Sequence, residues 1–305
     1  MENQKLYFIY NPRAGKGQIK NHMVRILDIF AKEGYEITIY PTKYPGDAVT
    51  AVQNVADGYD LCVCSGGDGT LDEVVTGMMK REKKLPIGYI PAGSTNDFAK
   101  SLKIPKMMEK AAEAIVRDER FSCDIGSFND DVFVYIAAFG LFTDVSYGTP
   151  QEIKNVLGHM AYLLEGMRRL PAVSNAYRLR VESNGKQIEE DFIFGMVTNS
   201  FSVGGFKSIT GKYVKLNDGL FEVTLIKRPQ NPLEMQGIMT ALLAQETDER
   251  YMYSFKTKEI IIEAQKKIPW TLDGEFGGEH KKVRIKNNRE TLEFIVPERK
   301  LKMLP

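Results

Sequence analysis

The sequence has few of the residues that build metal centres and disulfide frameworks. Cysteine and histidine occur 3 times each among the 305 residues, and the histidines are scattered. An odd, low cysteine count without framework spacing indicates a reducing compartment, and scattered histidines argue against a zinc site. Cys62 and Cys64 alternate along an apolar run, so we expect these thiols to be buried and structural.

The sequence also lacks a charge excess, a long apolar run and a signal peptide. Its formal net charge is +1, which gives no electrostatic basis for nucleic acid binding. No apolar run approaches the roughly 20 residues of a transmembrane helix. The N-terminal stretch MENQKLYFIYNP lacks the basic-then-apolar order of a signal peptide. We therefore expect a cytoplasmic protein.

The length of the chain favours two domains, because one core rarely grows much beyond about 250 residues. The first part alternates between strand and helix patterns, and strands spaced by helices are typical of a parallel sheet. The predicted strands are KLYFIYNP, YEITIYPT, YDLCVCSGG and LPIGYIPAG, and the predicted helices are residues 18–33, 46–57, 70–80 and 106–118.

The pattern becomes rich in strands near Cys123. Turns at Asn129 with Asp130, and at Asn184 with Gly185, predict two hairpins. A mostly antiparallel sandwich or barrel is expected to follow the α/β part. The further strands are LFEVTLIKR, KEIIIEA and KKVRIKNNRETLEFIVP, and two helices are predicted at 151–170 and 232–245.

The stretch SGGDGT connects the third predicted strand to a helix through three glycines and one aspartate. Backbone N–H groups at a helix N-terminus bind phosphate well, and glycine lets the backbone approach a ligand closely. Asp68 would repel a bare phosphate, but it suits a site in which Mg²⁺ lies between them. A glycine-rich turn in which Asp68 caps the helix is the alternative.

Two further turns follow predicted strands. NPRAGKG at 11–17 carries glycines with Arg13 and Lys16, although it is not a Walker A sequence. PAGSTNDFA at 91–99 places small hydroxyl residues before a helix. Open α/β sheets bind ligands at the carboxyl ends of their strands, so three such turns together favour a nucleotide site.

These motifs, GGDGT, NPRAGKG and PAGSTNDFA, resemble those of the bacterial diacylglycerol kinase-like lipid kinases, which are related to sphingosine kinases and distantly to NAD kinases and phosphofructokinases. The resemblance extends over nearly the whole chain and includes NDGLFEV and LDGE. It implies an α/β ATP-binding domain of residues 1–122 plus about 290–305. It also implies a β-sandwich domain for the lipid at 123–289, with the last strand, 292–300, returning to the first domain.

The resemblance assigns the ATP site to the three turns and to the end of the second strand, with Asp68 acting through Mg²⁺. Two residues depart from the family pattern. Asp72 replaces an asparagine and adds negative charge near the phosphates, whereas Ser94 replaces a threonine and keeps the hydroxyl. The implied nucleotide-binding set is Asn11, Thr42, Gly66, Gly67, Asp68, Gly69, Thr70, Glu73, Gly93, Ser94, Thr95, Asn96 and Asp97.

The LDGE motif carries the second implied catalytic residue besides Asp68, because Glu275 resembles the catalytic acid of the family. A carboxylate near a lipid hydroxyl can accept its proton as the bond to the γ-phosphate forms. In a strand, Asp273 would share a face with Glu275, and it is a candidate ligand of the catalytic metal. An acidic, glycine-rich turn is the alternative for this segment.

The NDGLFEV motif implies a structural Mg²⁺ away from the phosphates. The Asp218 side chain and backbone carbonyls would bind it, and the matching positions are Lys215, Asp218 and Leu220. An ordinary hairpin turn is the alternative.

Taken together, the resemblance implies an ATP- and Mg²⁺-dependent lipid kinase that phosphorylates diacylglycerol and meets the inner membrane surface peripherally. Two alternatives stay open: a kinase of the same fold that acts on a soluble nucleotide or sugar, and a nucleotide-binding regulator without catalysis. The helix at 151–170 and the loop at 200–213 are candidates for admitting the lipid, although a core-facing helix and a surface loop explain them as well. The sequence does not fix the oligomeric state, and a homodimer stays open.

Overall fold

A computed structural model describes residues 4–140, 176–200, 202–203, 206–207, 214–244 and 246–297. The helix expected at 151–170 lies outside these residues, as does most of the loop expected at 200–213. Within that loop, β10 (Ser202–Val203) and β11 (Phe206–Lys207) pair antiparallel.

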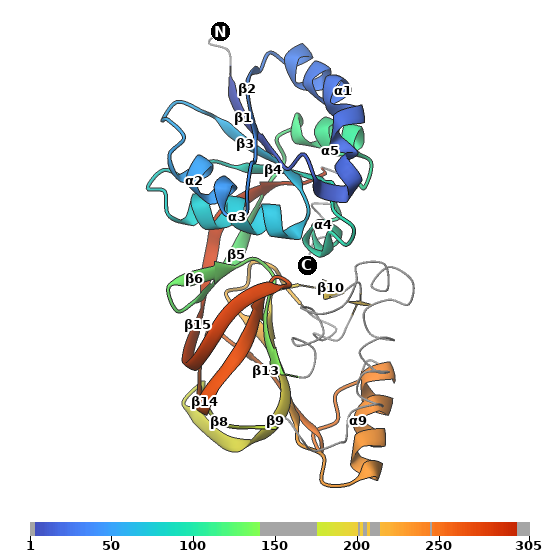
Figure 1. Cartoon of the computed structure of the whole chain (residues 1–305), viewed down its shortest axis with the longest axis vertical. Helices are drawn as coiled ribbons and strands as arrows, with labels where there is room; N and C mark the ends of the chain where they lie inside the picture. The colour runs from blue at the N-terminus through green and yellow to red at the C-terminus, as the bar shows by residue number, and fades with distance from the viewer. Residues whose placement is uncertain are drawn as a thin grey trace. The chain divides into compact units, whose positions relative to one another are not determined.

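The chain divides into two compact units (Figure 1). The first unit is Met1–Asp124 with Glu290–Pro305, and the second is Ile125–Arg289. The expected roles of the two segments in binding nucleotide and lipid stay predictions.

The first unit contains four parallel strands, β1 (Lys5–Tyr10), β2 (Glu36–Pro41), β3 (Leu61–Gly66) and β4 (Ile87–Pro91). They are the four strands predicted from the apolar runs, and their order in the sheet is β2–β1–β3–β4. Every residue of β3 and β4 is buried, as expected of strands covered on both faces. β2 is the edge strand, and its side chains are exposed or half-buried.

Helices cover both faces of this sheet. They are η1 (a 3₁₀ helix, Ala14–Gly17), α1 (Ile19–Lys32), α2 (Asp47–Gln53), α3 (Asp68–Met79), α4 (Asp97–Ser101) and α5 (Met108–Ile115). In Figure 1, α2 and α3 lie on one face and α1 and α5 on the other. α3 begins at Asp68, before the predicted start at residue 70, and this places Asp68 in the first turn of the helix.

The second unit is built from antiparallel strands. β5 (Arg120–Phe128), which begins in the first unit, and β6 (Asp131–Phe133) form the first predicted hairpin, and β8 (Tyr177–Ser183) and β9 (Lys186–Thr198) form the second. The remaining elements are β7 (Ile136–Gly140), β12 (Phe221–Lys227), α9 (Pro232–Ala244), β13 (Met252–Thr257), β14 (Glu259–Leu272) and β15 (Glu275–Ile295). The sequence reasoning missed β13.

The long strands β9 and β14 each pair with β7 along one part and with β8 along another. The four strands therefore close a circuit around an apolar core. Trp270 is 1% exposed at its centre, and its ring centroid lies 4.9 Å from that of Phe139 and 5.1 Å from that of Phe128. This core supports the β14–β15 hairpin, which carries Glu275.

One predicted strand is interrupted. The sequence predicts that DVFVYIAAFG continues as one strand of the first hairpin, but β6 ends at Phe133 and β7 starts at Ile136. The backbone N–H groups of Val134, Tyr135 and Ile136 donate to the Asp273 carboxylate. These N–H groups are therefore unavailable to continue the ladder with β5.

The end of β15 belongs to the first unit. Phe294 pairs with Ile87 of β4 in parallel orientation, and its ring centroid lies 5.0 Å from that of Phe98 in α4. The N–H of Val296 donates to the carbonyl oxygen of Glu119 at 2.9 Å.

The expectation for the cysteines is confirmed. Cys62, Cys64 and Cys123 are buried free thiols. Burial raises the pKa of Cys62 to about 12, so this thiol stays protonated at neutral pH.

Candidate active site

The three turns expected to form the nucleotide site touch one another at their glycines. A Cβ on Gly15 would lie 1.9 Å from the carbonyl oxygen of Ala92, and a Cβ on Gly93 would lie 2.6 Å from Cα of Gly67. A side chain at either position would push two turns apart. Glycine is therefore required here for the packing of the turns as well as for access to a ligand.

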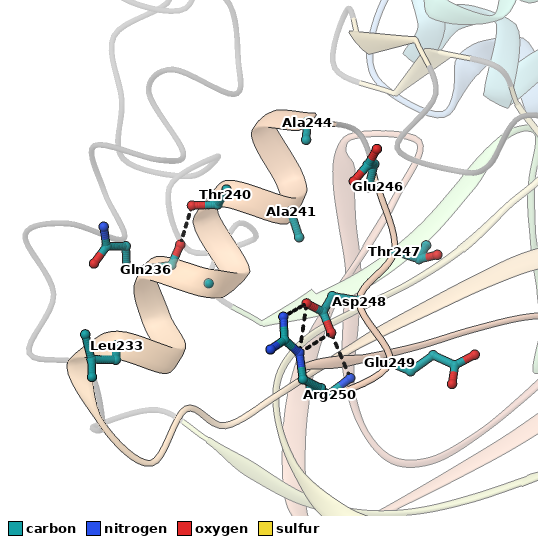
Figure 2. Close-up of a pocket in the computed structure, with 11 residues that line it drawn as sticks. Leu233, Gln236, Thr240, Ala241, Ala244, Glu246, Thr247, Asp248, Glu249 and Arg250 are labelled. Carbon is teal, nitrogen blue, oxygen red and sulfur yellow. Dashed lines mark hydrogen bonds and ion pairs between the residues drawn. The ribbon is translucent and has the colours of Figure 1, made fainter.

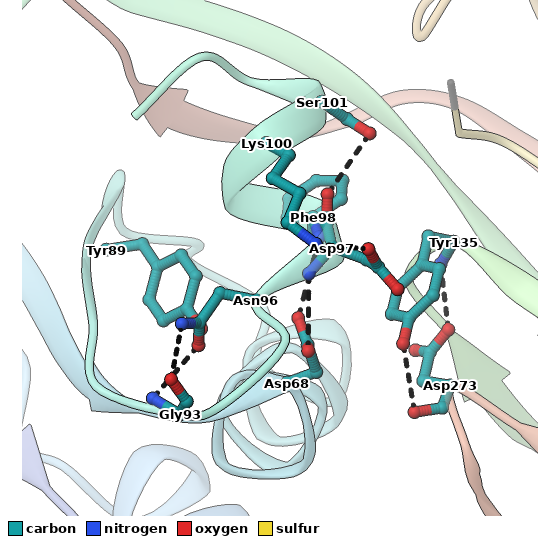
Figure 3. A network of polar contacts seen from close by, with 10 residues as sticks. All are labelled: Asp68, Tyr89, Gly93, Asn96, Asp97, Phe98, Lys100, Ser101, Tyr135 and Asp273. Carbon is teal, nitrogen blue, oxygen red and sulfur yellow. Dashed lines mark hydrogen bonds and ion pairs between the residues drawn. The ribbon is translucent and has the colours of Figure 1, made fainter. Parts of the chain in front are cut away.

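Hydrogen bonds join and shape the same turns. Asn11 Nδ2 donates to Thr70 Oγ1 at 3.2 Å. In the third turn, the Asn96 side chain closes on Gly93: its Nδ2 donates to the Gly93 carbonyl at 2.7 Å and its Oδ1 accepts from the Gly93 N–H at 3.0 Å (Figure 3). Asn11 and Asn96 thus fix the backbone of the turns, and their contact with a nucleotide stays a prediction.

Tyr89 and Gly66 complete this framework. The Tyr89 hydroxyl donates to the Gly66 carbonyl oxygen at 3.2 Å, and a Cβ on Gly66 would lie 2.4 Å from Cβ of Thr70. Tyr89 was not among the predicted site residues. It is a fully buried tyrosine inside an apolar strand, so its sequence pattern indicates only core packing.

The N-terminus of α3 is left open for a ligand. Gly67 is its N-cap residue and has no side chain to cap it. The Asp68 carboxylate accepts from the N–H groups of Asp97 and Phe98, at the start of α4, in place of the capping role in α3 that the alternative gave it. The first N–H groups of a helix have no partner within it, and in α3 they follow Gly67, where no Cβ obstructs an approaching anion.

The Asp68 carboxylate faces the third turn. It accepts from the backbone N–H of Asp97 at 3.3 Å and of Phe98 at 3.5 Å (Figure 3). Burial raises the pKa of Asp68 to about 6, the charge of Asp97 adds to this rise, and the backbone hydrogen bonds oppose it. Asp97 is 2% exposed, and its Oδ1 lies 3.0 Å from Lys100 Nζ.

Asp68 and Asp97 are the carboxylates of these turns that a divalent cation would use, and it would have to replace the Asp97 and Phe98 N–H groups on Asp68 and the Lys100 ammonium on Asp97. Mg²⁺ at phosphate sites is held by one or two carboxylates and completes its shell with phosphate oxygens and water. Among the described residues, no group of three or more His, Cys, Asp or Glu side chains could hold a metal ion by itself, so a cation here would need ligands from a bound phosphate. Its charge would offset the repulsion between the two carboxylates.

The loop after β2 is held rigidly beside the turns. The Thr42 N–H donates to the Tyr10 carbonyl at 2.9 Å. Glu73 Oε1 accepts from the Gly46 N–H at 2.8 Å, and its Oε2 accepts from the Ala48 N–H at 3.1 Å. Glu73 therefore anchors the N-terminus of α2, which fixes the loop that carries Thr42. Direct contact of Glu73 with a nucleotide stays a prediction.

Asp47 is a site residue that the sequence reasoning missed. It is 3% exposed, and its carboxylate accepts from the Lys43 N–H at 2.8 Å and from the Tyr40 hydroxyl at 3.0 Å. It thus ties both sides of the Thr42 loop together. The available signal was the sequence PGDA, in which an acidic residue opens a helix.

The remaining predicted residues differ in exposure. Ser94 and Thr95 are exposed at the tip of the third turn, where their hydroxyls can reach a ligand. Gly69 is half-buried in the first turn of α3, and Thr70 is buried behind it. Asp72, the departure from the family pattern, is half-buried on α3.

Glu275 and Asp273 lie in the second unit at a two-residue hairpin turn, with Asp273 as its first residue and Glu275 directly after it. Asp273 and Gly274 have φ values of 50° and 92°, and Leu272 pairs with Glu275 across the turn. Glu275 is exposed. Asp273 is 4% exposed, and its carboxylate accepts from the N–H groups of Val134 at 2.5 Å and of Ile136 at 2.9 Å. It also accepts from the N–H of Tyr135 at 2.9 Å (Figure 3).

Asp273 therefore anchors the turn that presents Glu275. The Asp273 N–H also donates to the Ile136 carbonyl at 2.9 Å, and the Tyr135 hydroxyl donates to the Asp273 carbonyl at 3.2 Å. Three N–H donors occupy most of the lone pairs that a metal would need. The geometry supports a positioning role for Asp273 in place of the expected metal ligand.

The turn at Lys215, Asp218 and Leu220 does not fit the expected structural Mg²⁺. Asp218 Oδ1 accepts from the Leu220 N–H at 3.0 Å, and its Oδ2 lies 3.3 Å from Lys256 Nζ. Both oxygens of the only side-chain ligand proposed for this metal thus already face donors.

A groove of about 500 Å³ lies along α9 in the second unit (Figure 2). Apolar, small and polar residues of the helix form one wall, and residues 246–250 form the other, where Arg250 Nη2 and Asp248 Oδ2 are 2.5 Å apart. None of the predicted site residues lines it. Among the described helices, none is long and apolar enough to cross a membrane.

Comparison with known proteins agrees with the geometry of the turns. The family model of the diacylglycerol kinase catalytic domain matches residues 5–128. The chain is 34% identical over 272 residues to a diacylglycerol kinase of Bacillus subtilis, with 88% of this chain and 89% of the relative covered. It is 32% identical over 274 residues to a diacylglycerol kinase of Staphylococcus carnosus, with 89% and 88% covered.

A solved structure shows the same fold. It is the crystal structure of a diacylglycerol kinase from Bacillus anthracis, which matches with a TM-score of 0.82 at 25% identity and covers 98% of this chain and 99% of the other. Nearly the full length of the chain thus follows these relatives in both sequence and fold. The chain belongs to the diacylglycerol kinase family, and it is a kinase.

Proposed function

We propose that this protein is an ATP- and Mg²⁺-dependent lipid kinase that transfers the γ-phosphate to the hydroxyl of diacylglycerol and forms phosphatidic acid. The observation that carries the proposal is the convergence of three glycine turns at the open N-terminus of α3. The identity to relatives named diacylglycerol kinases supports the choice of acceptor.

The nucleotide phosphates would bind at the N-terminus of α3. The N-cap residue Gly67 places no side chain over the N–H groups that follow it, and the positive end of the helix dipole favours an anion there. Ser94 and Thr95 would donate hydrogen bonds from the third turn, and Thr42 from the loop after β2. Because these turns are held by hydrogen bonds before ligand binds, little conformational entropy is lost on binding.

Mg²⁺ would be held by the carboxylates of Asp68 and Asp97, and it would supply positive charge to the phosphate oxygens during transfer. The raised pKa of Asp68 follows from burial beside Asp97. Ionisation of Asp68 is therefore favoured when a cation binds.

Glu275 would accept the proton of the lipid hydroxyl. As the oxygen of the hydroxyl bonds to the γ-phosphorus, the bond from phosphorus to the β–γ bridging oxygen breaks, and the proton passes to the Glu275 carboxylate. Asp273 keeps the Glu275 turn in place through its three backbone hydrogen bonds. Because the acceptor is a membrane lipid, we also propose peripheral contact with the membrane surface.

The test is transfer of radiolabelled γ-phosphate from ATP to a panel of acceptors: diacylglycerol in mixed micelles, other lipid alcohols, and soluble nucleosides and sugars. We expect label in the organic phase with diacylglycerol and Mg²⁺, and its loss when EDTA is added. Label only in soluble acceptors would contradict the lipid assignment.

The role of Glu275 is tested by Glu275→Gln against Glu279→Gln, an exposed acid further along β15. Glu275→Gln should bind ATP as the parent does and lose transfer by at least 100-fold, within the usual size of general base catalysis. Glu279→Gln should stay within about twofold of the parent. Full activity in Glu275→Gln would show that another group accepts the proton.

A further inference from the structure

Lys256 lies between two carboxylates of the second unit. Its Nζ is 2.9 Å from Glu222 Oε1 and 3.3 Å from Asp218 Oδ2. β12 and β13 place Glu222 directly opposite Lys256. The Glu222 side chain is 7% exposed and that of Lys256 is 35% exposed, so the ion pair is largely buried and reaches the turn that precedes β12.

This cluster brings two carboxylates to one ammonium group, and the Arg289 side chain packs against the same turn at Gly219. Glu222 Oε2 has no hydrogen-bond partner among the described residues. Buried polar oxygens normally have a donor, and buried charges are normally paired. The Lys256 ammonium group supplies a positive charge to both carboxylates from within the chain.

A divalent cation on the same Asp218 oxygen would lie close to Lys256 Nζ. The two positive charges would repel each other strongly because the surroundings are largely buried. Asp218 Oδ1 offers no better place, since it already accepts the Leu220 N–H. Lysine and metal therefore compete for one position.

We propose that the Lys256 ammonium group is the resident cation of the Asp218 turn, in the place that the family resemblance gives to a structural Mg²⁺. The turn then keeps its conformation without a divalent cation. Removal of the lysine charge leaves Asp218 and Glu222 as an uncompensated pair, and this pair becomes a divalent cation site. The inference does not depend on which alcohol the kinase phosphorylates.

The test counts Mn²⁺ ions bound to the full chain, without nucleotide, by isothermal titration calorimetry. The parent and Asp218→Asn should bind the same number of ions. Lys256→Met should bind one more, and the double variant Lys256→Met with Glu222→Gln should lose it again or bind it at least tenfold more weakly.

Two controls separate charge from a general effect of substitution. Lys256→Arg keeps the positive charge and should gain no ion. Lys258→Met removes an exposed lysine two residues away and should bind as the parent does. If Lys256→Met does not fold without metal, recovery of its folded state by Mn²⁺ supports the proposal equally, and the Asp218→Asn count remains an independent test.

The proposal is overturned if Asp218→Asn binds one ion fewer than the parent, because a metal would then occupy the turn beside Lys256. It is also overturned if folded Lys256→Met gains no ion. Neither result bears on lipid phosphorylation, which is measured in a separate experiment by the transfer of label. A failed transfer assay with an unchanged ion count would contradict the proposed function alone.

Discussion

A single carboxylate can fix a hairpin turn when several backbone N–H groups converge on it. Asp273 accepts from three consecutive residues and is itself in the left-handed conformation, with φ 50°. The sequence indicated an acidic residue near Glu275 and suggested a metal ligand. It could not show the three donors, because they come from residues 134–136, far away in the chain.

We predict that Asp273→Asn destabilises the second unit by about 1–3 kcal/mol, because an amide offers one acceptor oxygen and turns an NH₂ group toward backbone donors. Phosphate transfer should fall as well, since Glu275 loses its support. Urea unfolding and the transfer assay measure the two effects. Asp130→Asn, in an exposed turn, is the matched control and should stay within about 0.5 kcal/mol of the parent.

Glu222 gives a pH-dependent prediction. Burial raises its pKa to about 7 from 4.5, although Lys256 opposes the rise. Between these two pKa values the native state keeps a proton on Glu222 that the unfolded state has released. The stability that this bound proton contributes is lost as the pH rises from about 4.5 through 7.

Glutamine cannot titrate, so only the parent should lose this stability. The unfolding free energy of Glu222→Gln minus that of the parent should therefore increase by on the order of 1–3 kcal/mol between pH 5 and pH 8. Urea unfolding at both pH values, in EDTA, measures this difference. An offset between the two proteins that is the same at both pH values would show that Glu222 does not titrate in this range.

At the scale of elements, α2 is held at both ends by side chains from α3 and from the residues that directly follow α3. Glu73 binds the N–H groups at its start, and Arg81 Nη1 donates to the carbonyls of Val52 at 3.2 Å and Val55 at 2.6 Å near its end. A helix of 7 residues would be marginal alone. These contacts explain how so short a helix fixes the Thr42 loop.

The two helices also pack without space for a side chain at Gly77. A Cβ there would lie 2.6 Å from the Val49 carbonyl oxygen. Gly77→Ala should therefore destabilise the first unit by roughly 1–3 kcal/mol, although alanine favours an isolated helix by about 1 kcal/mol.

Thermal or urea unfolding tests the Gly77 prediction. Asn21→Ala, at an exposed position of α1, has a somewhat smaller propensity gain without the contact and should leave stability equal or slightly higher. A stabilised Gly77→Ala variant would mean that the helices separate freely.

The sequence predicted the elements better than their pairing. The four parallel strands, both hairpin turns and α9 were predicted from apolar spacing and turn residues, which are local signals. The strand MYSFKT was missed because its alternation is weak, with burial restricted to its ends. The break between β6 and β7 depends on Asp273, so no local pattern reveals it.

The candidate site was predicted to a similar extent. The glycine turns were found because glycine between a strand and a helix is a strong local signal. The roles of Asn96 and Glu73 were not, because their side chains bind backbone groups of their own turn or of a distant loop. Lys256 was also missed, since only the pairing of β12 with β13 brings it to Glu222.

At the scale of the whole molecule, the first unit is made from two separate stretches of chain. Phe294, contributed by β15, is fully buried and packs edge to face against Phe98. Phe294→Ala should cost about 3–5 kcal/mol and should increase hydrogen exchange in β4, its pairing partner. Val24→Ala, 79% exposed, serves as the control. Unchanged exchange in β4 would show that the end of β15 contributes little to the first unit.

The passage of β5 and β15 from one unit to the other has a consequence for synthesis on the ribosome. The strands of the first unit emerge early, but Phe294 arrives only after the whole of Ile125–Arg289 has been translated. Until then the nascent polypeptide presents an unpaired β4 edge, the kind of surface that aggregates or recruits chaperones. Completion of the first unit is thereby delayed until the second unit, which is translated after most of it, has been made.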